Sequence, residues 1–430
     1  MSRAVQVTGL GEERLLTPLI GGIESRSMTK SKPVSVCIIV ENLPVPTDRR
    51  VWREACALRD AGYQVSVICP KGKASCTSSY EVLDEIHIYR HRVWEGSGLT
   101  GYVAEYTLTL VAEFYLALKV YARTRFRILQ GCNPPDDIFL IGLFFKLFGV
   151  HFIFDHHDLA PELFEAKFGE RRRFCRALTG SIERCSFRAA NVSIATNESF
   201  RDVAIARGGK RPDQVFVVRN CPDLIKFRRV AVRPDIKRGK PLSVAYVGFM
   251  GIQDGLPLLL ESIERIVIHD KRTDTHFILV GDGIVLPELR RSAARKGLEP
   301  FLTFTGQVAY EDVITYLSSA DIGVAPDPKN ALNDSSTMIK ILEYMAFALP
   351  VVLFDLKEGR RIAGSAALYA SPNDPLDFAR QITRLLDSCE LRHQLGEYGR
   401  RKVQERLNWE VEKKVLLQAY SAALNGGRSS

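Results

Sequence analysis

The chain has 430 residues, of which 46% are hydrophobic and 25% are charged. That length exceeds what one hydrophobic core usually organises, and that composition excludes a largely disordered protein, so two domains are expected. The formal net charge of +9 indicates anionic partners such as nucleotides or anionic lipid. The basic residues are dispersed and match no recognised module, so a nucleic-acid partner is not expected.

The cysteines and the apolar runs indicate a cytoplasmic chain. Nine cysteines are scattered from Cys37 to Cys389 without a C-x-x-C pair or a Cys/His ligand set, which favours free thiols in a reducing compartment over zinc or disulfides. The apolar patch at 15–20 is too short for a signal-peptide core, so residues 1–32 are predicted to be a flexible tail. No run reaches the ~18 apolar residues of a membrane span, so any membrane contact is expected to be peripheral.

Apolar strands alternate with amphipathic helices in two successive series. The first, over 33–225, has expected strands at 34–40, 64–69, 151–154 and 191–196 and helices through 51–58, 140–147 and 174–190. A basic linker at 226–240 separates it from the second, over 241–408, with expected strands at 242–247, 276–280, 301–304, 322–325 and 351–354 and helices at 256–268, 286–296, 310–318, 338–347, 375–388 and 391–407. Continuous apolar strands are typical of parallel sheets covered on both faces, so the fold class is α/β, with two doubly wound, Rossmann-like domains facing a cleft. A final helix at 409–424 is expected to pack back on the first domain.

Ligands bind beyond the carboxyl ends of parallel strands, so motifs at the strand ends are the candidate sites. In the second domain a glycine-rich turn at 248–255, which includes Gly251, would let backbone N–H groups approach a phosphate, although a tight turn without a ligand is an equal alternative. The next helix is predicted to begin near Asp334 with a capped N-terminus. Lys340 and Glu343 share a face of it, where a lysine can neutralise phosphate and a carboxylate can accept ribose hydroxyls; the alternative is an ordinary ion pair on a capped helix.

Two further motifs follow strands of the first domain. Titratable groups gather at 155–158, where His157 and Asp158 are candidates for acid/base chemistry or hydroxyl binding, with simple helix capping by Asp158 as the alternative. Adjacent histidines do not readily share one ion, so no metal site is expected there. Arg49 and Arg50 follow the first strand and can bind an anionic acceptor or lie on a solvated helix face.

A surface that rests on anionic lipid is predicted from two neighbouring patterns. Residues 99–119 are apolar and aromatic, and basic clusters follow at 121–127 and 167–176. Arg171, Arg172 and Arg173 lie in the second cluster and are predicted to contact the lipid. A buried core helix is the alternative for 99–119.

Taken in order, these motifs resemble the retaining glycosyltransferases of family 4, which have the GT-B fold, and in particular the bacterial subgroup that builds capsular, exopolysaccharide or O-antigen repeat units. The resemblance spans roughly residues 34–424. Its segments are ENLPVPTDRRVWREA (41–55), DHHDLAPELFEAKFG (155–169), GFMGIQDGLPLLLESI (248–263), LVGDG (279–283), VAPDPKNALNDSSTMIKILEYMAFALPVV (324–352) and FDLKEGRRIAG (354–364).

The resemblance implies a cytoplasmic enzyme that moves a sugar from a nucleoside-diphosphate sugar to a saccharide or lipid-linked saccharide at the inner face of the membrane. It implies retention by front-face substitution, with no bound metal and no cofactor beyond the nucleotide-sugar co-substrate. It also implies the following sites: His157 beside the transferred sugar, the backbone around Ser336 and Thr337 on the diphosphate, Glu343 on the ribose, and the segment after Gly306, including Val308, on the base.

The chain departs from this pattern at two places. Ser335 stands where the family has the first glutamate of a pair, and Gln253-Asp254 stands where it has a basic pair. The phosphate charge is therefore assigned to Lys340, with Arg219 as the second choice. Two other functions remain open on the same architecture: a catalytically silent GT-B subunit that acts as a binding partner, and a nucleotide-sugar epimerase.

Overall fold

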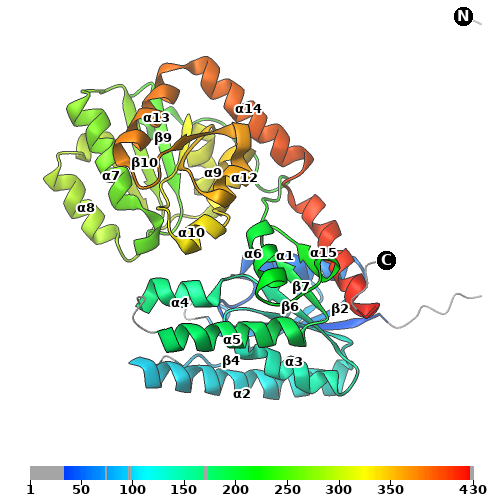
Figure 1. The fold of residues 1–430 in the computed structure, drawn as a ribbon. Helices are drawn as coiled ribbons and strands as arrows, with labels where there is room; N and C mark the ends of the chain where they lie inside the picture. Colours follow the sequence, from blue (N-terminus) through cyan, green and yellow to red (C-terminus); the bar gives the residue numbers. More distant parts are fainter. Residues whose placement is uncertain (1–32, 73–74, 95, 97, 169–172, 427–430) are drawn as a thin grey trace, which may run out of the picture. The chain divides into compact units, whose positions relative to one another are not determined.

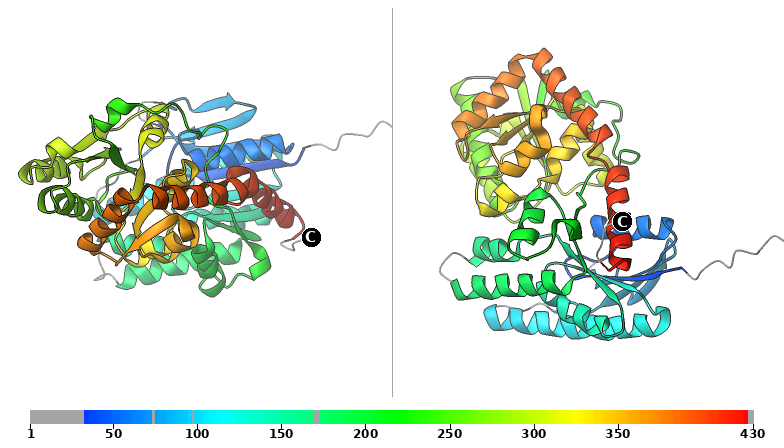
Figure 2. Two further views of the ribbon diagram at one scale, coloured as in Figure 1. Left: turned by 90° about the horizontal axis from the view of Figure 1, so that it is seen from above. Right: turned by 45° about the vertical axis from the view of Figure 1, so that its right-hand side comes forward.

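The computed structural model describes residues 33–72, 75–94, 96, 98–168 and 173–426. The folded unit extends from Val34. It contains two separate, mainly parallel sheets, each flanked by helices on both faces (Figures 1 and 2). The expectation of two doubly wound α/β domains is thereby confirmed.

The first sheet has eight strands in the order β3-β4-β2-β1-β5-β6-β7-β8. They are β1 (Ser35–Val40), β2 (Gln64–Pro70), β3 (Tyr80–Leu83), β4 (Ile86–His91), β5 (Ile128–Cys132), β6 (His151–His156), β7 (Val192–Ala195) and β8 (Val215–Val217). Only β3 runs antiparallel to its neighbour. The helices of this half are α1 (Arg49–Asp60), α2 (Gly98–Thr124), α3 (Phe139–Lys146), α4 (Ala160–Phe168), α5 (Arg173–Ala189) and α6 (Glu198–Ala206), with a short 3-10 helix at Asp136–Ile138.

The second sheet has six parallel strands in the order β11-β10-β9-β12-β13-β14. They are β9 (Leu242–Val247), β10 (Thr275–Val280), β11 (Leu302–Gly306), β12 (Ile322–Ala325), β13 (Val351–Phe354) and β14 (Ala367–Ala370). The helices are α7 (Leu256–Glu264), α8 (Leu286–Arg295), α9 (Tyr310–Ser319), α10 (Ala331–Ser335), α11 (Ile339–Ala346), α12 (Lys357–Ala363), α13 (Pro375–Asp387) and α14 (Cys389–Glu405). A π-helical turn at Arg265–His269 prolongs α7.

The last helix, α15 (Trp409–Leu424), packs against the first sheet although the chain reaches it from the second (Figure 1). Leu416 and Tyr420 are buried in the same apolar cluster as Ile38 of β1 and Ile153 of β6. The Tyr420 hydroxyl donates a hydrogen bond to the side chain of Gln130 on β5. The chain thus crosses between the halves twice, and its last helix closes the core of the first.

The start of α11 differs from the sequence expectation. Asn330, rather than Asp334, caps a separate short helix, α10, and an extended residue, Ser336, follows that helix. Helix α11 then begins at Ile339 with Met338 as its N-cap, and no side chain caps it. Asp334 instead accepts a hydrogen bond from the backbone N–H of Lys357. The prediction of a side-chain-capped N-terminus near Asp334 is therefore wrong, because tertiary contacts engage the capping residue elsewhere.

Within the described residues, no helix is long and apolar enough to cross a membrane. Helix α2 does leave large apolar side chains in contact with solvent, and α3 packs beside it through the rings of Phe114 and Phe144, whose centroids are 4.8 Å apart. Among the described residues, the exposed large apolar residues of these helices and of the turn after α3 are Tyr106, Leu108, Val111, Tyr115, Leu118, Leu140, Leu143, Leu147 and Phe148.

Candidate active site

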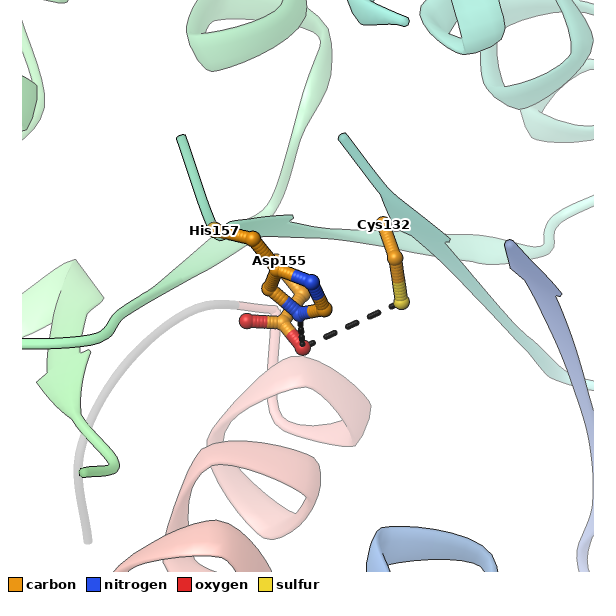
Figure 3. Close-up of side chains that lie close together, drawn as sticks. All are labelled: Cys132, Asp155 and His157. Carbon is orange, nitrogen blue, oxygen red and sulfur yellow. Dashed lines mark hydrogen bonds and ion pairs between the residues drawn. The ribbon is translucent and has the colours of Figure 1, made fainter. Parts of the chain in front are cut away.

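A buried polar network lies at the carboxyl end of β6, where the sequence predicted titratable chemistry. Asp155 is fully buried on β6, and its two carboxylate oxygens accept hydrogen bonds from Arg50 at 3.0 Å and from Gln130 at 3.1 Å. His157 Nε2 lies 2.7 Å from Asp155 Oδ2 (Figure 3). The side chain of Asn133, at the end of β5, accepts from the backbone N–H of His157 and of Asp158. Residues from three elements therefore fix the position of the His157 ring.

Charge determines which nitrogen of His157 carries a proton. The Arg50 guanidinium and His157 hold the pKa of Asp155 below its usual value although burial opposes this, so Asp155 is a carboxylate and accepts from His157 Nε2–H. Burial alone would lower the pKa of His157, but the Asp155 carboxylate outweighs it and raises that pKa. The raised pKa favours the protonated ring, and in that form Nδ1–H is available, since no described residue is bonded to it.

Cys132, Asp155 and His157 bring three possible metal ligands within 4.8 Å of one another (Figure 3). The surrounding charges do not suit a cation. Burial and the Asp155 carboxylate raise the pKa of the Cys132 thiol well above its usual value, so the thiol stays protonated. The Arg50 guanidinium occupies a position 3.0 Å from both Asp155 Oδ1 and His157 Nε2. The group is better described as a hydrogen-bonded network than as a metal site.

The two arginines at the start of α1 have different surroundings. Each nitrogen of Arg50 has a partner in the protein: Glu54 at Nε, the Val218 carbonyl at one terminal nitrogen and Asp155 at the other. Arg49 is exposed and lies over the ring of Tyr310, 4.5 Å from its centroid. Arg50 thus organises the network, and the prediction of acceptor binding at this helix start rests mainly on Arg49.

A cavity of about 720 Å³ lies at the carboxyl ends of β9 and β10 in the second half. Val308 and Gln307, which follow Gly306, line it together with Gly248 and Gly281. Both Gly248 and Gly281 have positive φ, and a Cβ on Gly281 would meet the Gly248 carbonyl at 2.0 Å, so only glycine allows these turns to approach each other. The glycines therefore open a space at the strand ends, beside Gln307 and Val308.

Lys340 on α11 lies beside this turn but is already paired. Its ammonium donates to Asp327 at 2.9 Å, is 3.7 Å from Asp254, and lies 4.8 Å from the centroid of the Tyr246 ring. Burial alone would lower the pKa of Lys340, but Asp327 and Asp254 outweigh it and raise that pKa. A phosphate at Lys340 would therefore compete with two aspartates. Arg219, the second choice for this role, is paired with Glu412 and Glu198.

Glu343 differs from Lys340 because no described side chain forms a hydrogen bond or ion pair with it. Burial raises the pKa of its carboxyl, while the nearby charges of Arg49 and Lys340 lower it. The hydroxyl of Thr337, just before α11, is buried and has no hydrogen-bond partner in the part of the chain that the structure describes, whereas the Ser336 hydroxyl donates to the Leu332 carbonyl. This stretch of chain thus carries polar groups without hydrogen-bond partners among the described residues: the uncapped start of α11, the Thr337 hydroxyl and the Glu343 carboxylate.

Several residues of this region were not expected from the sequence. Glu54, Gln130 and Tyr420 complete the network around Asp155, and they come from α1, β5 and α15. Only the pairing of strands and the return of the last helix bring them together. Asp327 follows β12, so the strand-end rule that selected Asp155 could have found it.

Two family models match the chain. Residues 47–221 match "Glycosyl transferase 4-like domain" and residues 241–388 match "Glycosyl transferases group 1", which together cover about three quarters of the chain. The chain is 27% identical over 156 residues to an alpha-D-kanosaminyltransferase of Streptomyces kanamyceticus, which is 36% of this chain and 39% of that protein. The chain therefore spans less than half the length of that curated relative.

Solved structures share the fold. Sucrose-phosphate synthase from Thermosynechococcus elongatus superimposes with a TM-score of 0.71 at 18% identity, over 91% of this chain and 99% of its own. HepE from Anabaena, solved with UDP and glucose, gives 0.65 at 13% identity over 90% and 100%. With both family models matched in order on two parallel-sheet domains, the chain belongs to the GT-B glycosyltransferases.

Proposed function

We propose that this protein is a retaining glycosyltransferase of family 4. It transfers a sugar from a nucleoside-diphosphate sugar to a saccharide, or to a lipid-linked saccharide, in surface polysaccharide biosynthesis at the cytoplasmic face of the membrane. The observation that carries the proposal is the unpaired carboxylate of Glu343, on a helix whose N-terminus no side chain caps. A carboxylate accepts both hydroxyls of a ribose, and free N–H groups at a helix start bind phosphate.

In this proposal the two halves of the chain have different roles. In the second half, the cavity beside Val308 receives the base, Glu343 binds the ribose and the backbone near Thr337 binds the diphosphate. In the first half, His157 donates from Nδ1 to a hydroxyl of the transferred sugar. No bound metal is invoked, and the departing phosphate accepts the acceptor's proton in a front-face substitution.

A panel of radiolabelled nucleotide sugars, incubated with the protein and with membranes, tests the function. Label in a lipid or saccharide fraction, together with released nucleoside diphosphate, is the expected result. Isomerised free nucleotide sugar would instead identify an epimerase. Donor binding without turnover would identify a catalytically silent subunit, and either outcome would overturn the proposal.

We further propose that α2 and α3 rest on anionic lipid. Leu147 and Phe148 are 81% and 55% exposed, and the exposed Arg125, which follows α2, lies over the Tyr121 ring at 5.2 Å from its centroid. The rings of Phe148 and Tyr121 lie 5.8 Å apart, so the two helices form one surface there. In the usual pattern of peripheral binding, apolar side chains insert between the lipid headgroups, and cationic side chains face those headgroups.

Changing Leu147 and Phe148 together to serine is expected to lower binding to vesicles that contain phosphatidylglycerol by more than about tenfold, since each buried apolar side chain contributes about 1.5–3 kcal/mol. The sequence also predicts that Arg171, Arg172 and Arg173 contact the lipid, and reversal of all three to glutamate tests this. Part of that segment lies outside the described residues. Sedimentation with vesicles at low and high salt measures both variants. Equal partition of the serine variant and the wild type would exclude the α2–α3 surface.

A further inference from the structure

The segment that precedes the proposed diphosphate site is held by residues of the first half. Helix α10 belongs to the second half, but it lies against α4 of the first. Its Leu332 packs against the apolar cluster of the first half that contains Phe154, Leu159 and Phe200. The Leu332 carbonyl in turn accepts a hydrogen bond from the Ser336 hydroxyl at 2.7 Å. A contact with the first half is therefore continuous with the backbone proposed to bind the diphosphate.

Asn197, which follows β7, contacts this segment through an amide whose orientation is fixed. Its Oδ1 caps α6 and accepts from the Phe200 N–H at 2.8 Å, so the amide nitrogen Nδ2 points away from that helix. Nδ2 donates to the Ser335 carbonyl at 2.9 Å, and Asn197 has no exposed surface. Ser335, where the sequence departs from the family pattern, thus contributes its backbone carbonyl. Because both ends of the buried amide are bonded, Asn197 fixes that carbonyl relative to α6.

Ser199 holds the same segment by a second route, through α12. Its hydroxyl donates to Glu358 Oε1 at 2.6 Å, and both residues are buried. A hydrogen bond to a carboxylate is stronger than one between neutral groups. The backbone N–H of Lys357, at the start of α12, donates to Asp334 Oδ1 at 2.9 Å. Ser199 therefore fixes α12, and α12 fixes the end of α10.

Resting on the proposed function, we propose that Asn197 and Ser199 are positioning residues of the donor site, although they belong to the half that carries His157. Neither side chain touches the donor in this proposal. They hold α10 and α12, and thereby keep the backbone N–H groups of Ser336 and Thr337 in the arrangement that the diphosphate needs. Without them the segment also samples other positions, and only the molecules with the segment in place bind the donor at full affinity.

Asn197→Asp separates the two hydrogen bonds of this side chain. Aspartate still caps α6, because its carboxylate accepts from the Phe200 N–H, but it presents an oxygen instead of a donor to the Ser335 carbonyl. In calorimetry on the full chain, UDP and GDP are expected to bind about tenfold more weakly than to the wild type. Asn197→Ser, which caps α6 without a charge and is too short to reach Ser335, should weaken binding by about threefold or more.

Kinetics distinguish a positioning role from a general loss of stability. With the nucleotide sugar that the radiolabelled panel identifies, KM for the donor should rise by the same factors in both Asn197 variants, and by about threefold in Ser199→Ala. The kcat at saturating donor should stay within about twofold of the wild type, because bound donor restores the position of the segment. A substitution that only destabilised the fold would lower the amount of active enzyme and leave KM unchanged.

Asn408→Asp is the matched control. Asn408 is the N-cap of α15, and its Nδ2 donates to the carbonyls of Val403 and Gln404, so the same change removes the same kind of bond at the start of a helix that packs on the first sheet. Wild-type affinity for both nucleotides is expected. Wild-type affinity in Asn197→Asp, or an equal loss in Asn408→Asp, would overturn the proposal. A wild-type protein that binds neither nucleotide would count against the proposed function instead.

Discussion

Replacing His157 by alanine is expected to lower turnover by about 10- to 150-fold, the effect of losing a charge-assisted hydrogen bond of about 1.5–3 kcal/mol to the reacting sugar, while nucleoside diphosphate binds almost as in the wild type. The structure gives the reason. Asp155 and Asn133 fix the ring, and the raised pKa of His157 favours the protonated form, in which Nδ1–H can donate. The fold should tolerate the change, because Asp155 keeps its bonds to Arg50 and Gln130.

The pH profile adds a second readout for His157. Since the protonated ring is the donor, kcat should fall as the pH rises through the raised pKa of His157, and this fall should be absent from the residual activity of His157→Ala. His151→Ala is the matched control, because His151 lies on the same strand, β6, at the end opposite to the network. Turnover that is unchanged in His157→Ala would leave the network a purely structural role.

Glu343→Gln is expected to weaken the binding of nucleoside diphosphate by about 10- to 150-fold, the loss expected when a charge-assisted hydrogen bond of about 1.5–3 kcal/mol is removed. Glutamine fills the same volume, and no described residue depends on the Glu343 carboxylate for a hydrogen bond. The folded state should therefore be as stable as the wild type. Burial raises the pKa of Glu343, and the nearby charges of Arg49 and Lys340 oppose that rise; the ionised form is the one that accepts both ribose hydroxyls.

Calorimetry with UDP and GDP measures this effect. Thermal unfolding without ligand checks that stability is unchanged, and Glu311→Gln, on the exposed face of α9, serves as the control. A Glu343→Gln protein that binds both nucleotides with wild-type affinity would contradict the ribose assignment. In that case the unpaired carboxylate would need another partner, and the acceptor would be the next group to test.

Local pattern was enough to predict most of the regular structure. Strand β9 begins and ends where the run of apolar residues places it, and the expected helices at 310–318 and 338–347 correspond to α9 and α11 within one residue at each end. Buried parallel strands are continuous apolar runs, and covering helices carry an apolar stripe, so both signals are local. The same strand-end rule directed attention to His157 and Glu343.

Tertiary structure alone decided which groups are free to act. Lys340 and Arg50 were predicted from the sequence to bind ligands. In the structure Lys340 is instead paired with Asp327, and Arg50 with Asp155. Conversely, Glu41 follows β1 and His91 ends β4, and a cavity that both residues line exists only because these strands lie in one sheet. The sequence specifies the local spacing of apolar residues directly. The pairing of charged residues instead depends on distances between segments that are far apart in the sequence, and only the folded chain determines those distances.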